Sequence, residues 1–210
     1  MLNWQDLFRD FITMFVVIDP IGSIPVFFFA ARGVPPELHA RFAIHAVAAA
    51  TVILLLFLIG GQILFEALEL SLGAFQVSGG IVLFMFATTM IFGDSKPTTE
   101  IQTAKKDHLS GAIYPLAIPS IASPGAMLAV VILTDNNTFS IQHQAVTAGI
   151  LLIVLAITLV VLLLATFIRR VIGDSGASVI SRVMGIILAT VAVDSVLAGL
   201  QSYGVLGASG

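Results

Sequence analysis

Six apolar runs of membrane-spanning length dominate this sequence of 210 residues. They cover residues 11–31, 42–65, 75–92, 112–133, 145–168 and 183–203. A helix needs about 20 apolar residues to cross the hydrocarbon core of a bilayer, so each run is long enough for one span. Hydrophobic residues make up 58% of the chain and charged residues only 10%, which is too few to cover a soluble domain. We therefore expect an all-α integral membrane protein with six transmembrane helices.

The basic residues are distributed unevenly among the connections between these runs. Arg9 lies in the segment before the first run. All the other basic residues lie in the first, third and fifth connections, which share the opposite side of the membrane. These others are Arg32, Arg41, Lys96, Lys105, Lys106, Arg169, Arg170 and Arg182. Cytoplasmic loops of membrane proteins are enriched in Lys and Arg. This pattern predicts that the three basic connections are cytoplasmic and that both termini lie outside.

The composition also narrows the possible functions. The net charge is −3 and the basic residues form no stripe, so we expect no nucleic-acid partner. The chain has no cysteine, which excludes disulfides and thiolate metal sites. No metal-ligand spacing and no phosphate-binding loop is present, so we expect no metal and no cofactor. The lipid bilayer is the one partner that the composition requires, and the sequence predicts no oligomeric state.

The two halves of the chain resemble each other. Residues 18–25 parallel 118–125 at an offset of 100, and residues 80–83 parallel 185–188 at an offset of 105. Each half then holds three spans, and an odd number of crossings turns the second copy upside down. We expect two inverted three-helix repeats, at residues 1–95 and 111–210, joined by a cytoplasmic linker at 96–110.

Proline and glycine cluster at the corresponding place in each half. The clusters comprise Pro20, Gly22 and Pro25 in the first run and Pro115, Pro119, Pro124 and Gly125 in the fourth. A proline inside a helix removes a backbone hydrogen bond and costs about 3 kcal/mol. We therefore expect the first and fourth helices to be broken near the midplane. Paired broken helices in inverted halves indicate a transporter's binding site, whereas the alternative is that these prolines only kink the helices for packing.

The segments at 19–25, 115–125 and 182–185 resemble the MarC family of bacterial and archaeal inner-membrane proteins, and the resemblance covers essentially the whole chain. Members of this family include the small neutral amino acid transporter SnatA. The resemblance implies an inner-membrane location and ion-gradient-driven transport of amino acids like glycine and alanine. Ser23 stands where family members commonly carry Asn, and it keeps a small polar group at that place.

A small amino acid is expected to bind where the two broken segments meet. Helix N-termini offer free N–H groups and a positive dipole end to its carboxylate. Serine hydroxyls add donors, and small residues leave the backbone open to close approach. The expected substrate contacts are Asp19, Pro20, Gly22, Ser23, Pro119, Ser120, Ala122, Ser123 and Gly125.

Two acids lie deep within the apolar runs, Asp19 and Asp194. A carboxylate at the centre of a bilayer costs about 2.5–3.5 kcal/mol on insertion scales, so each needs a partner. We assign Asp19 to binding of the substrate ammonium, a proton or a cation, and Asp194 to coupling, with H⁺ or Na⁺ as the coupling ion. The alternatives are that Asp19 caps the second half-helix and that Asp194 bonds Ser or Thr neighbours in packing.

Other polar residues have a simpler interpretation beside the functional one. Thr88 and Thr89 could line the cavity, but Thr in membrane helices often bonds to its own helix. We expect His39, His108 and His143, which lie in connections, to be solvated.

Three functions remain open at this point. The first is an ion-coupled secondary transporter of small neutral amino acids that works by alternating access, in uptake or in export. The second is a channel or facilitator for small polar solutes. The third, an intramembrane aspartyl protease, is disfavoured because Asp19 precedes a proline and Asp194 lacks flanking glycines, so we expect no enzyme.

Overall fold

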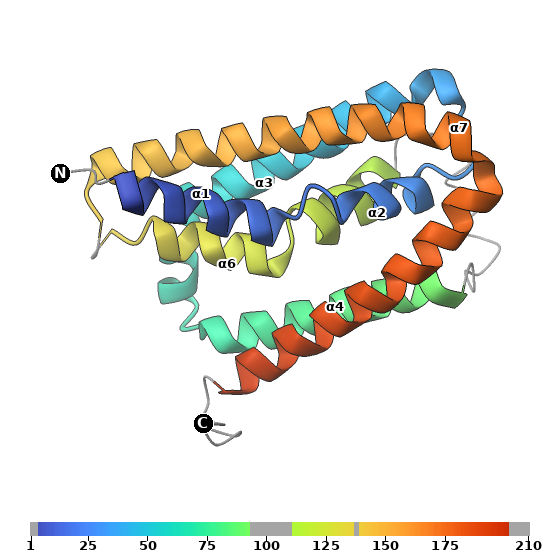
Figure 1. Ribbon diagram of the computed structural model, residues 1–210. Coiled ribbons are helices and arrows are strands. Elements are labelled where there is room, and N and C mark those ends of the chain that lie inside the picture. The colour runs from blue at the N-terminus through green and yellow to red at the C-terminus, as the bar shows by residue number, and fades with distance from the viewer. Residues whose placement is uncertain (1–3, 93–110, 137–138, 202–210) are drawn as a thin grey trace.

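The computed structural model describes residues 4–92, 111–136 and 139–201, and helices make up nearly all of them (Figure 1). The elements are α1 (Trp4–Ile18), α2 (Ser23–Ala30), η1 (Pro36–Leu38), α3 (His39–Ala67), α4 (Leu72–Phe92), η2 (Ala112–Ile121), α6 (Pro124–Leu133) and α7 (Ile141–Gln201). The expected all-α class is confirmed for these residues. The linker expected at 96–110 lies outside them, as does His108.

Four helical segments among the described residues are long and apolar enough to cross a membrane. They are Trp4–Ala30, Pro36–Ala67, Gly73–Phe92 and Ile141–Ala165. The bent pair of η2 and α6 makes a fifth if it is counted as one span. The last part of α7, Gly185–Gln201, is apolar but shorter. The sixth span, expected at 183–203, stays a prediction.

The chain leaves helical geometry at both proline–glycine clusters. α1 ends at Ile18 and α2 begins at Ser23, and between them Asp19 has a left-handed backbone with φ of 48°. In η2, Tyr114 and Ile118 have extended backbone angles, and each precedes a proline. A proline ring disfavours helical geometry in the residue before it, so these interruptions are set locally. Despite the first interruption, α1 and α2 together form one apolar segment, Trp4–Ala30. At the second, the axes of η2 and α6 are bent by 53°.

The fifth connection, expected between the runs at 145–168 and 183–203, is helical, which corrects the expectation that these two runs form separate helices. α7 continues for 61 residues, and Figure 1 shows it bending and running back beside other elements. No proline lies between residues 141 and 201. Gly173 and Gly176 each cost only about 1 kcal/mol relative to alanine in a helix interior, whereas a proline would cost about 3 kcal/mol.

The helices form two layers in Figure 1. In one layer α1 lies beside α6, α2 lies beside η2, and α3 and the first part of α7 pack with them. In the other, α4 and the second part of α7 run antiparallel. The largest buried side chains in the first layer include Phe27, whose ring lies 5.9–6.1 Å from those of Phe28, His39 and Phe42.

The two helices of the second layer approach closely through glycines. A Cβ on Gly80 would lie 2.8 Å from the carbonyl oxygen of Ala192. A Cβ on Gly185 would lie 3.2 Å from the carbonyl oxygen of Ala87. Small residues of this kind let helix backbones pack at short range in membranes. The residues 80 and 185, and likewise 87 and 192, are separated by the offset of 105 found in the sequence.

Candidate functional site at the paired helix breaks

Asp19 organises the first break. Its Oδ1 accepts a hydrogen bond of 2.9 Å from the backbone N–H of Gly22, and its carbonyl oxygen accepts one of 3.0 Å from the Ser23 hydroxyl. A Cβ on Gly22 would collide with the Asp19 carboxylate, so the turn requires glycine there. Asp19 therefore caps a free N–H at the start of α2, while its side chain remains exposed.

Ser123 organises the second break. Its Oγ accepts a hydrogen bond of 3.0 Å from the backbone N–H of Ala126 and so caps α6, with Pro124 at the first helical position. The same hydroxyl donates a hydrogen bond of 3.3 Å to the carbonyl oxygen of Val17, in the last turn of α1. That carbonyl has lost its intrahelical partner because α1 ends at Ile18. One side chain thus joins the two breaks.

The half-helix that begins at the second break has its N-terminus beside the first break. The Ser123–Val17 contact places the positive end of α6 against the last turn of α1, six residues before α2 begins. The exposed carboxylate of Asp19 follows Val17 by two residues. The positive end of α6 and this carboxylate together complement a zwitterion.

Open backbone surrounds the start of α6. A Cβ added at Gly125 would meet only the Ser123 Oγ, at 3.8 Å. On the other side, Gly79 of α4 packs against the ring of Pro124, and a Cβ there would collide with that ring. The second layer of helices therefore touches the second break through a glycine.

The other predicted site residues have different surroundings. Pro20, Pro119 and Ala122 are buried and Ser120 is half-buried at the two breaks. Asp194 lies on an exposed face of α7, in the layer formed with α4.

Thr88 and Thr89 of α4 bond to their own helix. Their hydroxyls donate hydrogen bonds of 2.7 Å to the carbonyl oxygens of Met85 and Phe86. Both threonines thus bond to the backbone of their own helix, which is the alternative to a role in lining the cavity. Substrate binding and ion coupling by the predicted residues stay predictions.

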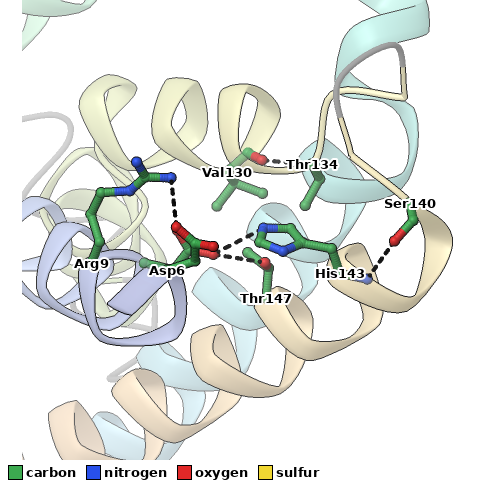
Figure 2. Close-up of polar contacts among 8 residues, drawn as sticks. Asp6, Arg9, Val130, Thr134, Ser140, His143 and Thr147 are labelled. Carbon is green, nitrogen blue, oxygen red and sulfur yellow. Dashed lines mark hydrogen bonds and ion pairs between the residues drawn. The ribbon is translucent and has the colours of Figure 1, made fainter. Parts of the chain in front are cut away.

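A polar cluster that sequence reasoning missed lies between α1 and α7 (Figure 2). It consists of Asp10, His143 and Thr147. His143 is largely buried and His39 is buried, which corrects the expectation that both are solvated. One signal was available: His143 and Thr147 are four residues apart, so they share a helix face. Their partner Asp10 is too distant in sequence for any local pattern to reveal it.

Ser123→Ala is expected to lower the free energy of unfolding by about 1 kcal/mol, because it removes the cap of α6 and the link to Val17. Thermal unfolding in detergent measures this. Ser195→Ala is the control, since that hydroxyl bonds only to the carbonyl oxygen of Val191 in its own helix and alanine favours helix. Equal stability of the Ser123 variant and the parent would contradict the capping role.

Apolar helices of this length, with a polar junction between two broken segments, define a multi-pass integral membrane protein. The chain matches the MarC family of integral membrane proteins over residues 4–203. It belongs to that family.

Relatives from distant organisms cover nearly all of the chain. A UPF0056 membrane protein of Methanocaldococcus jannaschii is 32% identical over 90% of this chain and 84% of its own. A UPF0056 membrane protein of Aquifex aeolicus is 31% identical over 96% of this chain and 97% of its own. The UPF0056 inner membrane protein YhgN of Escherichia coli is 27% identical over 91% and 94%. These names state no substrate. No solved structure matches the chain significantly.

Proposed function

We propose that the protein is an ion-coupled secondary transporter of small neutral amino acids such as glycine and alanine. The observation that supports it is the hydrogen bond from Ser123 to the Val17 carbonyl, which joins the two helix breaks. Transporters place their substrate sites at paired broken helices of this kind. The name of the relative in Escherichia coli supports an inner-membrane location.

The junction has a partner for each charge of an amino acid. The N–H group of Gly125 at the start of α6 receives the substrate carboxylate, because the N–H groups that follow it, on Ala126 and Met127, are bonded to Ser123. Asp19 and backbone carbonyl oxygens at the breaks receive the ammonium, and Asp19 and Asp194 take part in coupling to H⁺ or Na⁺. The open backbone at Gly125 admits a substrate close to the chain, so a long side chain is rejected by contact with the helix.

Alternating access requires two related halves, and the helix contacts support an inverted repeat. Gly80 contacts Ala192, and Gly185 contacts Ala87. Gly185 corresponds to Gly80 and Ala192 corresponds to Ala87 at the sequence offset of 105, so the two contacts are equivalent in the repeat. The neighbours α1–α6 and α2–η2 exchange in the same way under the offset of 100. Exchanged contacts between antiparallel elements are the geometry of inverted-topology repeats.

The proposed orientation places both termini outside and the basic connections in the cytoplasm. Figure 1 has the start of α1 and the end of α7 at one end of the molecule. The connection between α2 and α3 and the bend of α7 lie at the other end.

Flux of labelled glycine into proteoliposomes tests the function. We expect uptake to accelerate with an inward proton or sodium gradient, and unlabelled glycine on the far side to stimulate exchange. Protein-free liposomes and labelled leucine are the controls, and leucine is expected to give no flux. Flux without counterflow would replace the carrier by a channel, and no flux of glycine or alanine would reject the substrate class.

A further inference from the structure

A buried acid–histidine pair fastens the first helix to the last helix at the end of the molecule where both begin (Figure 2). The Asp10 side chain, on α1, is 0% exposed, and the His143 side chain, on α7, is 13% exposed. The imidazole Nε2 lies 3.1 Å from Oδ2 of Asp10. The Thr147 hydroxyl donates a hydrogen bond of 3.2 Å to the same oxygen. Asp10 therefore receives both of these contacts from one face of α7.

The pair carries an unsatisfied polar atom. Oδ1 of Asp10 is buried and has no hydrogen-bond partner among the described residues. The His143 Nε2 stands at ion-pair distance but is not aligned as a hydrogen bond. A buried carboxylate is costly unless it is paired and bonded. With a neutral imidazole the pair holds one negative charge in buried surroundings, and one added proton makes it neutral.

The local structure holds the imidazole in place. The His143 ring stacks on the ring of Phe139, with centroids 4.4 Å apart and planes 11° apart. Its backbone N–H donates a hydrogen bond of 3.4 Å to the Ser140 hydroxyl at the start of α7. The imidazole is therefore presented to α1 by a fixed first turn.

Several other charged groups lie near this end of the bundle. On α1, Asp6 and Arg9 are 4.0 Å apart on the exposed surface (Figure 2). On α3, Glu66 accepts a hydrogen bond from Gln62, and Asp135 follows α6. Exposed pairs such as Asp6–Arg9 contribute little because water and salt screen them. Among the described residues, His143 is the group that brings a titratable positive charge into contact with Asp10.

We propose that Asp10 and His143 form a proton-binding latch between α1 and the first turns of α7. A proton on the pair cancels its charge and keeps the two helices together. Loss of that proton leaves a buried negative charge, which α1 relieves by moving away from α7 toward water. A rise in pH removes the proton from the pair, so we expect the latch to open at high pH and close at low pH. The site is separate from Asp19 and does not depend on the proposed substrate.

Spin labels test the latch directly, because the chain has no cysteine that would take up a label elsewhere. Phe8→Cys on α1 and Ile141→Cys on α7 place labels at side chains that are 59% and 84% exposed. In proteoliposomes, we expect a narrow distribution of label distances at about pH 5 and a broader, longer one at about pH 8. The same distribution at both pH values would overturn the proposal.

Two variants should respond in opposite ways. Asp10→Asn has the same shape but no carboxylate, so the negative charge that opens the latch at about pH 8 is absent and its distribution should stay narrow at that pH. His143→Gln cannot take the proton, so its distribution should be broad at both. Asp6→Asn is the matched control, one turn earlier on α1, and should keep the pH response of the parent.

The outcome does not depend on whether the protein transports glycine, because no flux is measured. If His143→Gln fails to fold, the comparison of Asp10→Asn with the parent decides the question. A broad distribution of Asp10→Asn at about pH 8 would also overturn the latch.

Discussion

Asp19→Asn is expected to reduce gradient-driven glycine flux in proteoliposomes to the background rate while the protein still folds. Asparagine retains an oxygen that accepts the hydrogen bond from Gly22, and it tolerates the left-handed backbone at this position. Only the charge is lost. Removing one partner of a bonded charge pair costs about 2–5 kcal/mol, which is roughly 30-fold or more in affinity.

Asp19→Ala separates the charge of this residue from its cap. Alanine loses both, so we expect the same loss of flux together with a fall of about 0.5–2 kcal/mol in the free energy of unfolding. Normal flux in Asp19→Asn with reduced flux in Asp19→Ala would leave Asp19 as a cap only, and would reject its role in binding.

Gly80→Ala and Gly185→Ala are each expected to lower the free energy of unfolding by about 1–3 kcal/mol. The new methyl group would lie 2.8 Å and 3.2 Å, respectively, from a backbone carbonyl oxygen of the facing helix. A backbone atom cannot turn aside as a flexible side chain can, so α4 and α7 must separate. Thermal unfolding in detergent measures both losses.

Gly149→Ala is the matched control on α7, because a Cβ there would meet no atom within 4 Å. Alanine in an open helix position gains about 0.5–1 kcal/mol over glycine. If Gly80→Ala and Gly185→Ala melted like Gly149→Ala, the close approach of the two helices would be wrong.

The helix breaks could be predicted from sequence because their cause is local. Pro115 and Pro119 each disfavour helical geometry in the residue before them, and the structure has extended angles at Tyr114 and Ile118. The runs at 42–65, 75–92 and 112–133 likewise predicted α3, α4 and the η2–α6 pair within a few residues, since length and hydrophobicity set a membrane span. By contrast, α1 begins seven residues before its run, and α7 joins the last two runs. Ser123 was expected among the substrate contacts and not as a cap, although serine before proline is a common helix start.

Features that depend on tertiary contact could not be predicted in this way. The polar stretch between the last two apolar runs was expected to be a connection, but α7 continues through it as a helix. Asp10 gave no signal of burial, because its partners His143 and Thr147 belong to the other half of the chain. The Val17–Ser123 bond that joins the breaks has the same origin.

The unbroken course of α7 limits how the two layers can move. Its first part packs with α1, α2 and α3, and its second part packs with α4, yet no loop divides the two parts. If one layer shifts against the other, α7 must bend over several hydrogen-bonded turns, because no flexible loop connects its two parts. Such bending stores elastic energy in α7, and that energy favours the return of the two layers to their original arrangement.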